Sequence, residues 1–158
     1  MTPRRARCRQ CDRTHVFIPT RAFPRRTDSV ETVWAALAAA AQGLGHRRVA
    51  EQVGVPATTV RGWLRRARAN TNTMAIRAAV ARSDLDHNAS EYVPRLDSPL
   101  AHMVNEVGGA ACAWKRRFGT APRLPGLTGT LHQIASFITG GWLLTENVPT
   151  SAQIWGPG

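Results

Sequence analysis

Several features that secreted and membrane proteins need are scarce in this sequence of 158 residues. Three cysteines are too few for the disulfide framework of a small extracellular domain. The longest apolar stretch, 131–144, is interrupted by His132, Gln133, Gly140 and Gly141, and it falls short of the ~18 residues of a membrane span. No apolar segment follows the N-terminal arginines as a secretion signal would require. We therefore expect a cytoplasmic protein with no membrane partner.

Motifs of common catalytic sites are also lacking. The sequence has no Gly-rich phosphate loop, no His-Glu-x-x-His zinc motif and no nucleophile elbow. A transposase-type active site holds two metal ions with carboxylates on a mixed α/β scaffold. The carboxylates of the second half form no pair on a convincing strand. We expect no enzyme, and no small-molecule substrate is evident.

Acidic residues are few beside the basic ones, since 10 Asp and Glu stand against 21 Lys and Arg for a net charge of +11. Lys115 is the only lysine, and the guanidinium of arginine binds phosphates and guanine edges through two hydrogen bonds. Residues 1–70 carry a net charge of +10 and residues 71–158 a net charge of +1. We expect a polyanion, nucleic acid or acidic lipid, to bind the first half.

Hydrophobic periodicity predicts a mostly α protein. The apolar positions from Val30 to Leu44 recur at helical spacing, and Asp28-x-x-Glu31 has the spacing of a capping box at the start of that helix. We expect Trp34 to share one core with Trp63. The predicted parts are a short β-knuckle arm (1–26), a three-helix helix-turn-helix domain that folds by itself (27–69), a linker with a short helix (70–97) and a small helical C-terminal region (98–158).

Three features are expected within the second half. Residues 70–73 read as a polar joint, followed by a short helix over 74–82. Ser98 and Pro99 start a helix that keeps its apolar period as far as Phe118, with Cys112 as a small buried residue. Gly108-Gly109 within it predicts a kink or a close helix crossing. Thr130-x-x-Gln133 is the capping-box spacing of the last helix.

The segment 46–65 carries the strongest functional signal. A helix-turn-helix needs a small residue where its two helices touch and a glycine where the backbone turns left-handed. Ala50 and Gly54 stand at those two places. Val60, Trp63 and Leu64 supply apolar residues to a shared core.

The opposite face of the second helix is polar, as reading a DNA major groove requires. Its stripe is formed by Thr58, Arg61, Arg65 and Arg68. We predict base contacts from Ala57, Thr58, Arg61, Gly62 and Arg65. We predict phosphate contacts from Arg4, Arg5, Arg7, Arg9, Arg47, Arg48, Arg66 and Arg68.

These patterns predict sequence-specific binding of double-stranded DNA. The role would be that of a transcriptional regulator or of the DNA-recognition part of a mobile-element system, associated with the nucleoid. A homodimer is compatible with this interpretation. The alternative is a protein-interaction or oligomerisation module whose basic face is incidental.

Cys8 and Cys11 form a Cys-x-x-Cys turn between two expected strands, 6–8 and 14–18. A zinc ribbon needs two such knuckles to give zinc four ligands in tetrahedral geometry, and only one is present here. His15 offers a third ligand at most. We expect no cofactor, with zinc at Cys8 and Cys11 as the alternative.

Residues 45–66 look like the helix-turn-helix of insertion-sequence transposases and site-specific invertases. Together with residues 7–15 and 138–144, they resemble actinobacterial transposase-like proteins that carry a domain of unknown function. The resemblance implies DNA binding and, for the C-terminal half, no known activity. It also implies that Cys8 and Cys11 are the second knuckle of a zinc ribbon.

Overall fold

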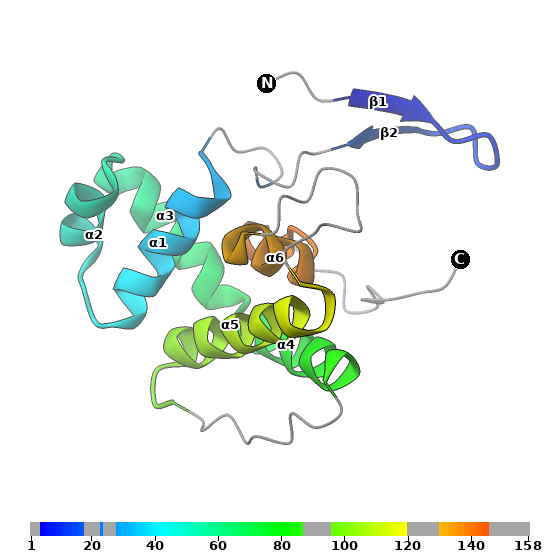
Figure 1. Cartoon of the computed structure of the whole chain (residues 1–158). Helices are drawn as coiled ribbons and strands as arrows, with labels where there is room; N and C mark the ends of the chain where they lie inside the picture. The colour runs from blue at the N-terminus through cyan, green and yellow to red at the C-terminus, as the bar shows by residue number, and fades with distance from the viewer. Residues whose placement is uncertain (1–3, 18–22, 24–27, 87–95, 120–129, 146–158) are drawn as a thin grey trace.

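The computed structural model describes residues 4–17, 23, 28–86, 96–119 and 130–145, and it confirms the mostly α fold with a short N-terminal arm (Figure 1). No described helix combines the length and apolar character needed to cross a membrane. The elements are β1 (Arg4–Arg7), β2 (Thr14–Phe17), α1 (Val30–Ala41), α2 (His46–Val53), α3 (Ala57–Ala69), α4 (Thr71–Leu85), α5 (Pro99–Phe118), α6 (Leu131–Ile138) and a 3₁₀ turn, η1 (Trp142–Leu144).

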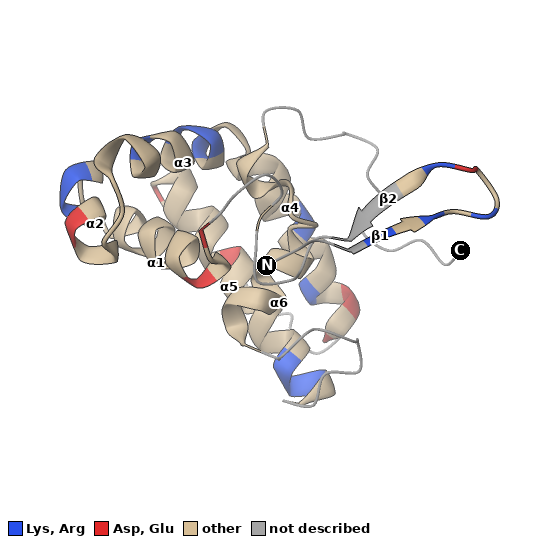
Figure 2. Ribbon diagram, turned by 90° about the horizontal axis from the view of Figure 1, so that it is seen from above, with Lys and Arg blue, Asp and Glu red and all other residues tan. Residues whose placement is uncertain are grey.

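The arm is an antiparallel hairpin in which Arg4 lies opposite Phe17 and Arg7 opposite Thr14. The expected first strand was two residues too late. Cys8 begins the turn: its N–H still donates to the carbonyl of Arg13 (2.8 Å), but its own carbonyl accepts from the N–H of Asp12 (3.0 Å). Both views show the hairpin projecting from the helical body (Figures 1 and 2).

Ser29 caps α1, because its hydroxyl accepts a hydrogen bond from the N–H of Thr32 (3.1 Å). This corrects the expectation that Asp28 begins the helix. A serine in extended backbone conformation is well suited to this position. The apolar face of α1 is buried as predicted, with Val33 and Leu37 fully enclosed.

The helix expected over 74–82 is present but longer at both ends, and the predicted polar joint at 70–73 was wrong because residues 71–73 already belong to α4. Helix α4 runs from Thr71 to Leu85, and a single residue separates it from the end of α3 at Ala69. Asn70 lies between the two helices and is buried. Its side-chain amide donates to the carbonyls of Leu143 (3.0 Å) and Thr145 (2.8 Å). These bonds explain why a polar residue is placed in the core at the junction.

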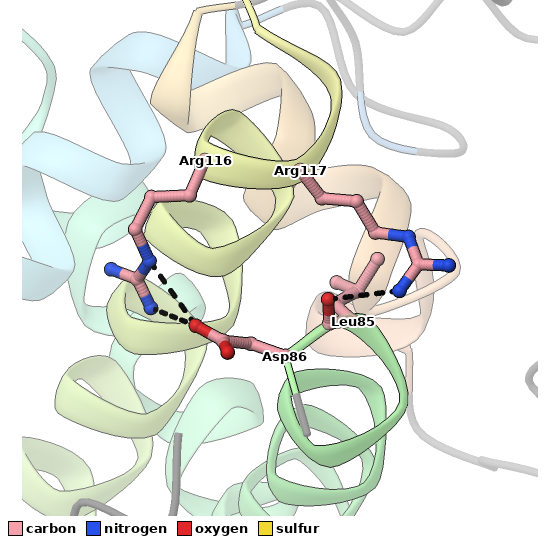
Figure 3. Close-up of polar contacts among 4 residues, drawn as sticks. All are labelled: Leu85, Asp86, Arg116 and Arg117. Atoms are coloured by element: carbon pink, nitrogen blue, oxygen red, sulfur yellow. Dashed lines mark hydrogen bonds and ion pairs between the residues drawn. The ribbon is translucent and has the colours of Figure 1, made fainter. Parts of the chain in front are cut away.

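Helices α4 and α5 are parallel neighbours, since the start of α4 lies near the start of α5 and Leu85 lies near Arg117. Figure 3 shows the C-terminal ends joined by two arginines of α5. Arg116 donates to the carboxylate of Asp86 (3.0 Å), and Arg117 donates to the carbonyl of Leu85 (3.1 Å). Arginine near a helix C-terminus satisfies carbonyls that the helix itself leaves without donors.

The structure does not show the close crossing predicted at the glycine pair within α5: a Cβ on Gly108 would meet nothing within 4 Å, and one on Gly109 would make only an ordinary contact. A Cβ on Gly109 would lie 3.4 Å from the side chain of Arg82 on α4. Ser98 and Pro99 start this helix as expected. Cys112 is exposed, contrary to prediction, because Ala111 and Ala113 take the buried positions on either side of it.

Helix α6 packs against α1 and α5. Thr130 caps it as predicted, accepting from the N–H of Gln133 (3.3 Å). Gly140 and Gly141 follow with φ of 60° and 72°, a left-handed conformation that favours glycine. The chain then enters η1. Indole Nε1 of Trp34 in α1 donates to the hydroxyl of Ser136 in α6 (3.1 Å), so residues 102 positions apart share one buried contact.

One core is shared by the described helices, and no described side chain of the hairpin belongs to it. Trp34 and Trp63 belong to the same buried cluster, as predicted, and so do residues of α4, α5 and α6. The helix-turn-helix therefore packs directly on the C-terminal helices.

Candidate nucleic-acid interface

Helices α1, α2 and α3 form the expected helix-turn-helix. Ala50 of α2 is buried where α2 meets α3. Gly54 ends α2 with φ 69° and ψ 31°, the left-handed conformation that the turn requires. Pro56 occupies the N-cap position of α3, where its fixed φ is compatible with helix entry. Ala50 and Gly54 thus have the roles that the sequence predicted.

One face of α3 is buried and the other is exposed. Val60, Trp63, Leu64 and Ala67 are enclosed in the core. The predicted stripe of Thr58, Arg61, Arg65 and Arg68 is exposed along the opposite face. A recognition helix needs this division, because its polar face has to enter the groove while its apolar face stays on the domain.

Ala57 and Gly62, the other two predicted base-contact residues, are half-buried. The structure gives Gly62 a specific neighbour: a Cβ there would lie 3.0 Å from Nη2 of Arg66. The guanidinium of Arg66 thus lies back along its own helix, one turn toward the N-terminus. Arg66 is half-buried as a result, whereas Arg65 and Arg68 are exposed.

Arg47 and Arg48 are exposed in the first turn of α2. Arg47 shares a shallow hollow with Gly54 and Ala57, which brings it near the start of α3. Gly45, the N-cap of α2, provides no side-chain cap. Phosphate groups bind well at such helix ends, because the first N–H groups of a helix have no partner within it. Figure 2 shows basic residues on α2, α3 and the hairpin.

In the hairpin, Arg5, Arg7 and Arg9 are exposed. Arg7 already forms an ion pair with Asp12 on the same turn. The side chain of Arg4 lies outside the described residues. The arm thus presents basic groups to solvent, one of them paired within the hairpin.

The cysteine turn has a defined geometry. The N–H of Asp12 donates to the carbonyl of Cys8 (3.0 Å), and Asp12 adopts a positive φ of 55°. The backbone N–H groups of Cys11 and then Gln10 donate to the Cys8 sulfur and hold the pKa of its thiol below the ordinary value. Stabilised thiolates are good metal ligands. Among the described residues, no group of three or more His, Cys, Asp or Glu side chains is placed to hold a metal ion. The side chain of His15 lies outside the described residues.

The burial of Asn70 was not predicted, although the sequence carries a signal for it. Val60, Ala67 and Met74 are buried at helical intervals, and Asn70 continues the same stripe. A polar residue on an apolar stripe indicates a buried side chain that needs partners. Its partners, carbonyls more than 70 residues away, could not be identified from this spacing.

Residues 27–71 match the family model of a homeodomain-like domain. A search of curated proteins and a search of solved structures each found no match. The matched segment contains α1, α2, α3 and the junction at Asn70, less than a third of the chain. The match supports a helix-turn-helix protein that binds DNA.

Proposed function

We propose that this chain binds a specific double-stranded DNA sequence by placing α3 in the major groove. The observation that carries the proposal is the exposed stripe of Thr58, Arg61 and Arg65 on a helix whose other face is fixed in the core. Arginine pairs with O6 and N7 of guanine, and threonine bonds a base edge or contacts a thymine methyl. Ala57 and Gly62 lie on the same helix, where the backbone can approach the bases closely.

Phosphate contacts come from the groups that surround this stripe. Arg47 and Arg48 at the start of α2, with Arg66 and Arg68 on α3, bind the backbone and fix the orientation of the helix without reading sequence. The arm adds Arg4, Arg5, Arg7 and Arg9, which follow phosphates or a minor groove. A net charge of +10 in residues 1–70 favours this assignment.

The chain acts either as a transcriptional regulator or as the DNA-recognition part of a mobile-element system, in the cytoplasm and at the nucleoid. We propose recognition rather than catalysis as its activity, without a resident cofactor. A second copy of the chain is compatible with the proposal, because helix-turn-helix dimers bind two half-sites about one helical turn apart.

The alternative is a protein-interaction module, and exposed Ile76 and Val80 on α4 favour it. The two functions differ in their response to salt. Binding to DNA releases counterions and weakens steeply as salt rises, whereas apolar docking does not.

The test is selection of bound duplexes from a random library by the purified chain, followed by affinity measurements on the selected and a random duplex. We expect one enriched sequence, bound ~10³-fold or more tightly than random DNA, and a steep loss of affinity with salt on both duplexes. A library without enrichment would disprove sequence-specific binding. Binding that is unaffected by salt would favour the interaction module.

A further inference from the structure

A cleft of about 520 Å³ lies between the N-terminal halves of α4 and α5. This volume falls within the usual range of small-molecule sites, ~300–1,000 Å³. Apolar side chains from both helices and from Leu96 form much of its lining. Polar groups come from both helices and from Asp97, which precedes α5. The residues used below are Ile76 and Ala79 of α4, Asp97 before α5, and His102 and Glu106 of α5.

Two side chains that line this cleft each carry a buried polar atom with no hydrogen-bond partner among the described residues. Glu106 is only 5% exposed, and its Oε2 makes no hydrogen bond. The nearest cation, Nη2 of Arg82, is 3.5 Å from Oε2, which is long for a charge-assisted hydrogen bond. Nδ1 of His102, one helical turn earlier, is buried in the same way. Buried polar atoms normally have partners, so both atoms indicate a ligand with donors.

The charge of the cleft indicates the class of ligand. Two carboxylates, Glu106 and Asp97, line it, and no Lys or Arg does so in the described part of the chain. This is unusual in a protein with 21 basic and 10 acidic residues. Arg82 offsets part of the Glu106 charge from one side, while Asp97 is exposed. A cation with hydrogen-bond donors suits such a lining.

We propose that this cleft binds a small organic amine, a protonated amino group on a compact hydrocarbon body. The ammonium group donates to Oε2 of Glu106 and to Nδ1 of His102, with Asp97 adding attraction at the rim. The hydrocarbon body packs against Ile76 and Ala79. This inference is independent of DNA binding, since none of these residues belongs to the proposed DNA interface.

The experiment titrates the full chain with three probes that share one hydrocarbon body and differ in charge: 2-phenylethylamine, 2-phenylethanol and 3-phenylpropionate. Backbone amide resonances report where each probe binds. We expect the amine to bind at least about tenfold more tightly than the alcohol or the carboxylate. The shifted amides should lie in the first halves of α4 and α5.

Two matched variants locate the site. Ile76 is 56% exposed and lines the cleft, whereas Val80 is 46% exposed one turn later and does not line it. Ile76→Lys should abolish amine binding by placing a cation at the rim, and Val80→Lys should leave it unchanged. Both positions are exposed, so neither variant endangers the fold. Glu106→Gln, which keeps the shape of the side chain, should weaken the amine about tenfold while leaving the alcohol unchanged.

Three results would overturn the proposal. The first is equal affinity for all three probes or no saturable binding of the amine. The second is a set of shifted amides outside the cleft. The third is Ile76→Lys binding the amine as tightly as Val80→Lys, which would place the amine elsewhere even if Glu106→Gln failed to fold.

Discussion

Arginine has opposite roles in the two halves of this molecule. In the helix-turn-helix, Arg61, Arg65 and Arg68 are exposed on α3. In the C-terminal helices, Arg116 and Arg117 bind the end of α4 (Figure 3), and Arg82 pairs with buried Glu106. The comparison teaches that the number of arginines alone does not define a DNA-binding surface. What matters is where the fold places their guanidinium groups, since Arg116 and Arg117 are exposed as well but bind the end of α4.

The largest effect is expected where the two halves share their core. Trp63→Ala should lower the free energy of unfolding by ~3–5 kcal/mol, because it removes a side chain that is 99% buried and leaves a cavity. Urea unfolding of the full chain, followed by circular dichroism, measures this change. A loss below ~1 kcal/mol would mean that Trp63 lies outside the core.

The same packing changes what we expect of the isolated segment 27–69. The sequence predicted that it folds by itself, but its Trp34 donates to Ser136 of α6. Without the C-terminal helices, the surface of α1 that faces α5 and α6 would meet water. We therefore expect the isolated segment to be much less stable than the full chain.

A smaller loss of stability should follow from removing the side-chain hydrogen bonds of Asn70, which connect the two halves. Asn70→Ala removes a buried amide that donates to the carbonyls of Leu143 and Thr145, and such a change costs ~1–3 kcal/mol. Asn72→Ala is the matched control, since Asn72 is exposed two residues away. It should change the free energy of unfolding by less than ~0.5 kcal/mol. Equal losses for the two variants would contradict the structural role of Asn70.

These effects separate what the sequence could and could not predict. The helix-turn-helix was predictable because its requirements are local: Ala50, Gly54 and the apolar residues of α3 lie within 20 positions. Asn70 and the parallel pairing of α4 with α5 depend on contacts between distant segments. Cys112 was misplaced by a single helical position, since Ala111 and Ala113 compete for the same core. Exposure of the stripe on α3 followed from spacing alone, whereas its contacts with DNA stay a prediction.

The smallest of these losses in stability should come from the partly exposed ion pair at the end of α4. Arg116 is 60% exposed and Asp86 is 27% exposed at the side chain, so water screens their attraction. Arg116→Ala should lower the free energy of unfolding by no more than ~1 kcal/mol. Urea unfolding at low and high salt measures it, and a loss above ~2 kcal/mol would show a deeper role for Arg116.

A further prediction concerns the reactivity of the Cys8 thiol in the arm and not the stability of the fold. Its pKa is lowered by N–H donors from Cys11 and Gln10, and only the thiolate reacts with iodoacetamide. Alkylation of Cys8 should therefore accelerate at a lower pH in the folded chain than in urea, where these donors are lost. Mass spectrometry after timed quenching gives the rates. Identical pH profiles in both conditions would show that the turn does not hold the thiolate.

The most direct test compares two double variants that each remove two positive charges. Arg61→Ala/Arg65→Ala changes the exposed stripe of α3, and Arg116→Ala/Arg117→Ala changes the end of α5. The measurement is the ratio of affinities for the selected and a random duplex. We expect the first variant to lose ~1–3 kcal/mol of discrimination for each guanidinium that reads a base, and the second to keep the ratio of the parent chain. Unchanged discrimination in the α3 variant, or an equal loss in the α5 variant, would contradict DNA recognition by α3.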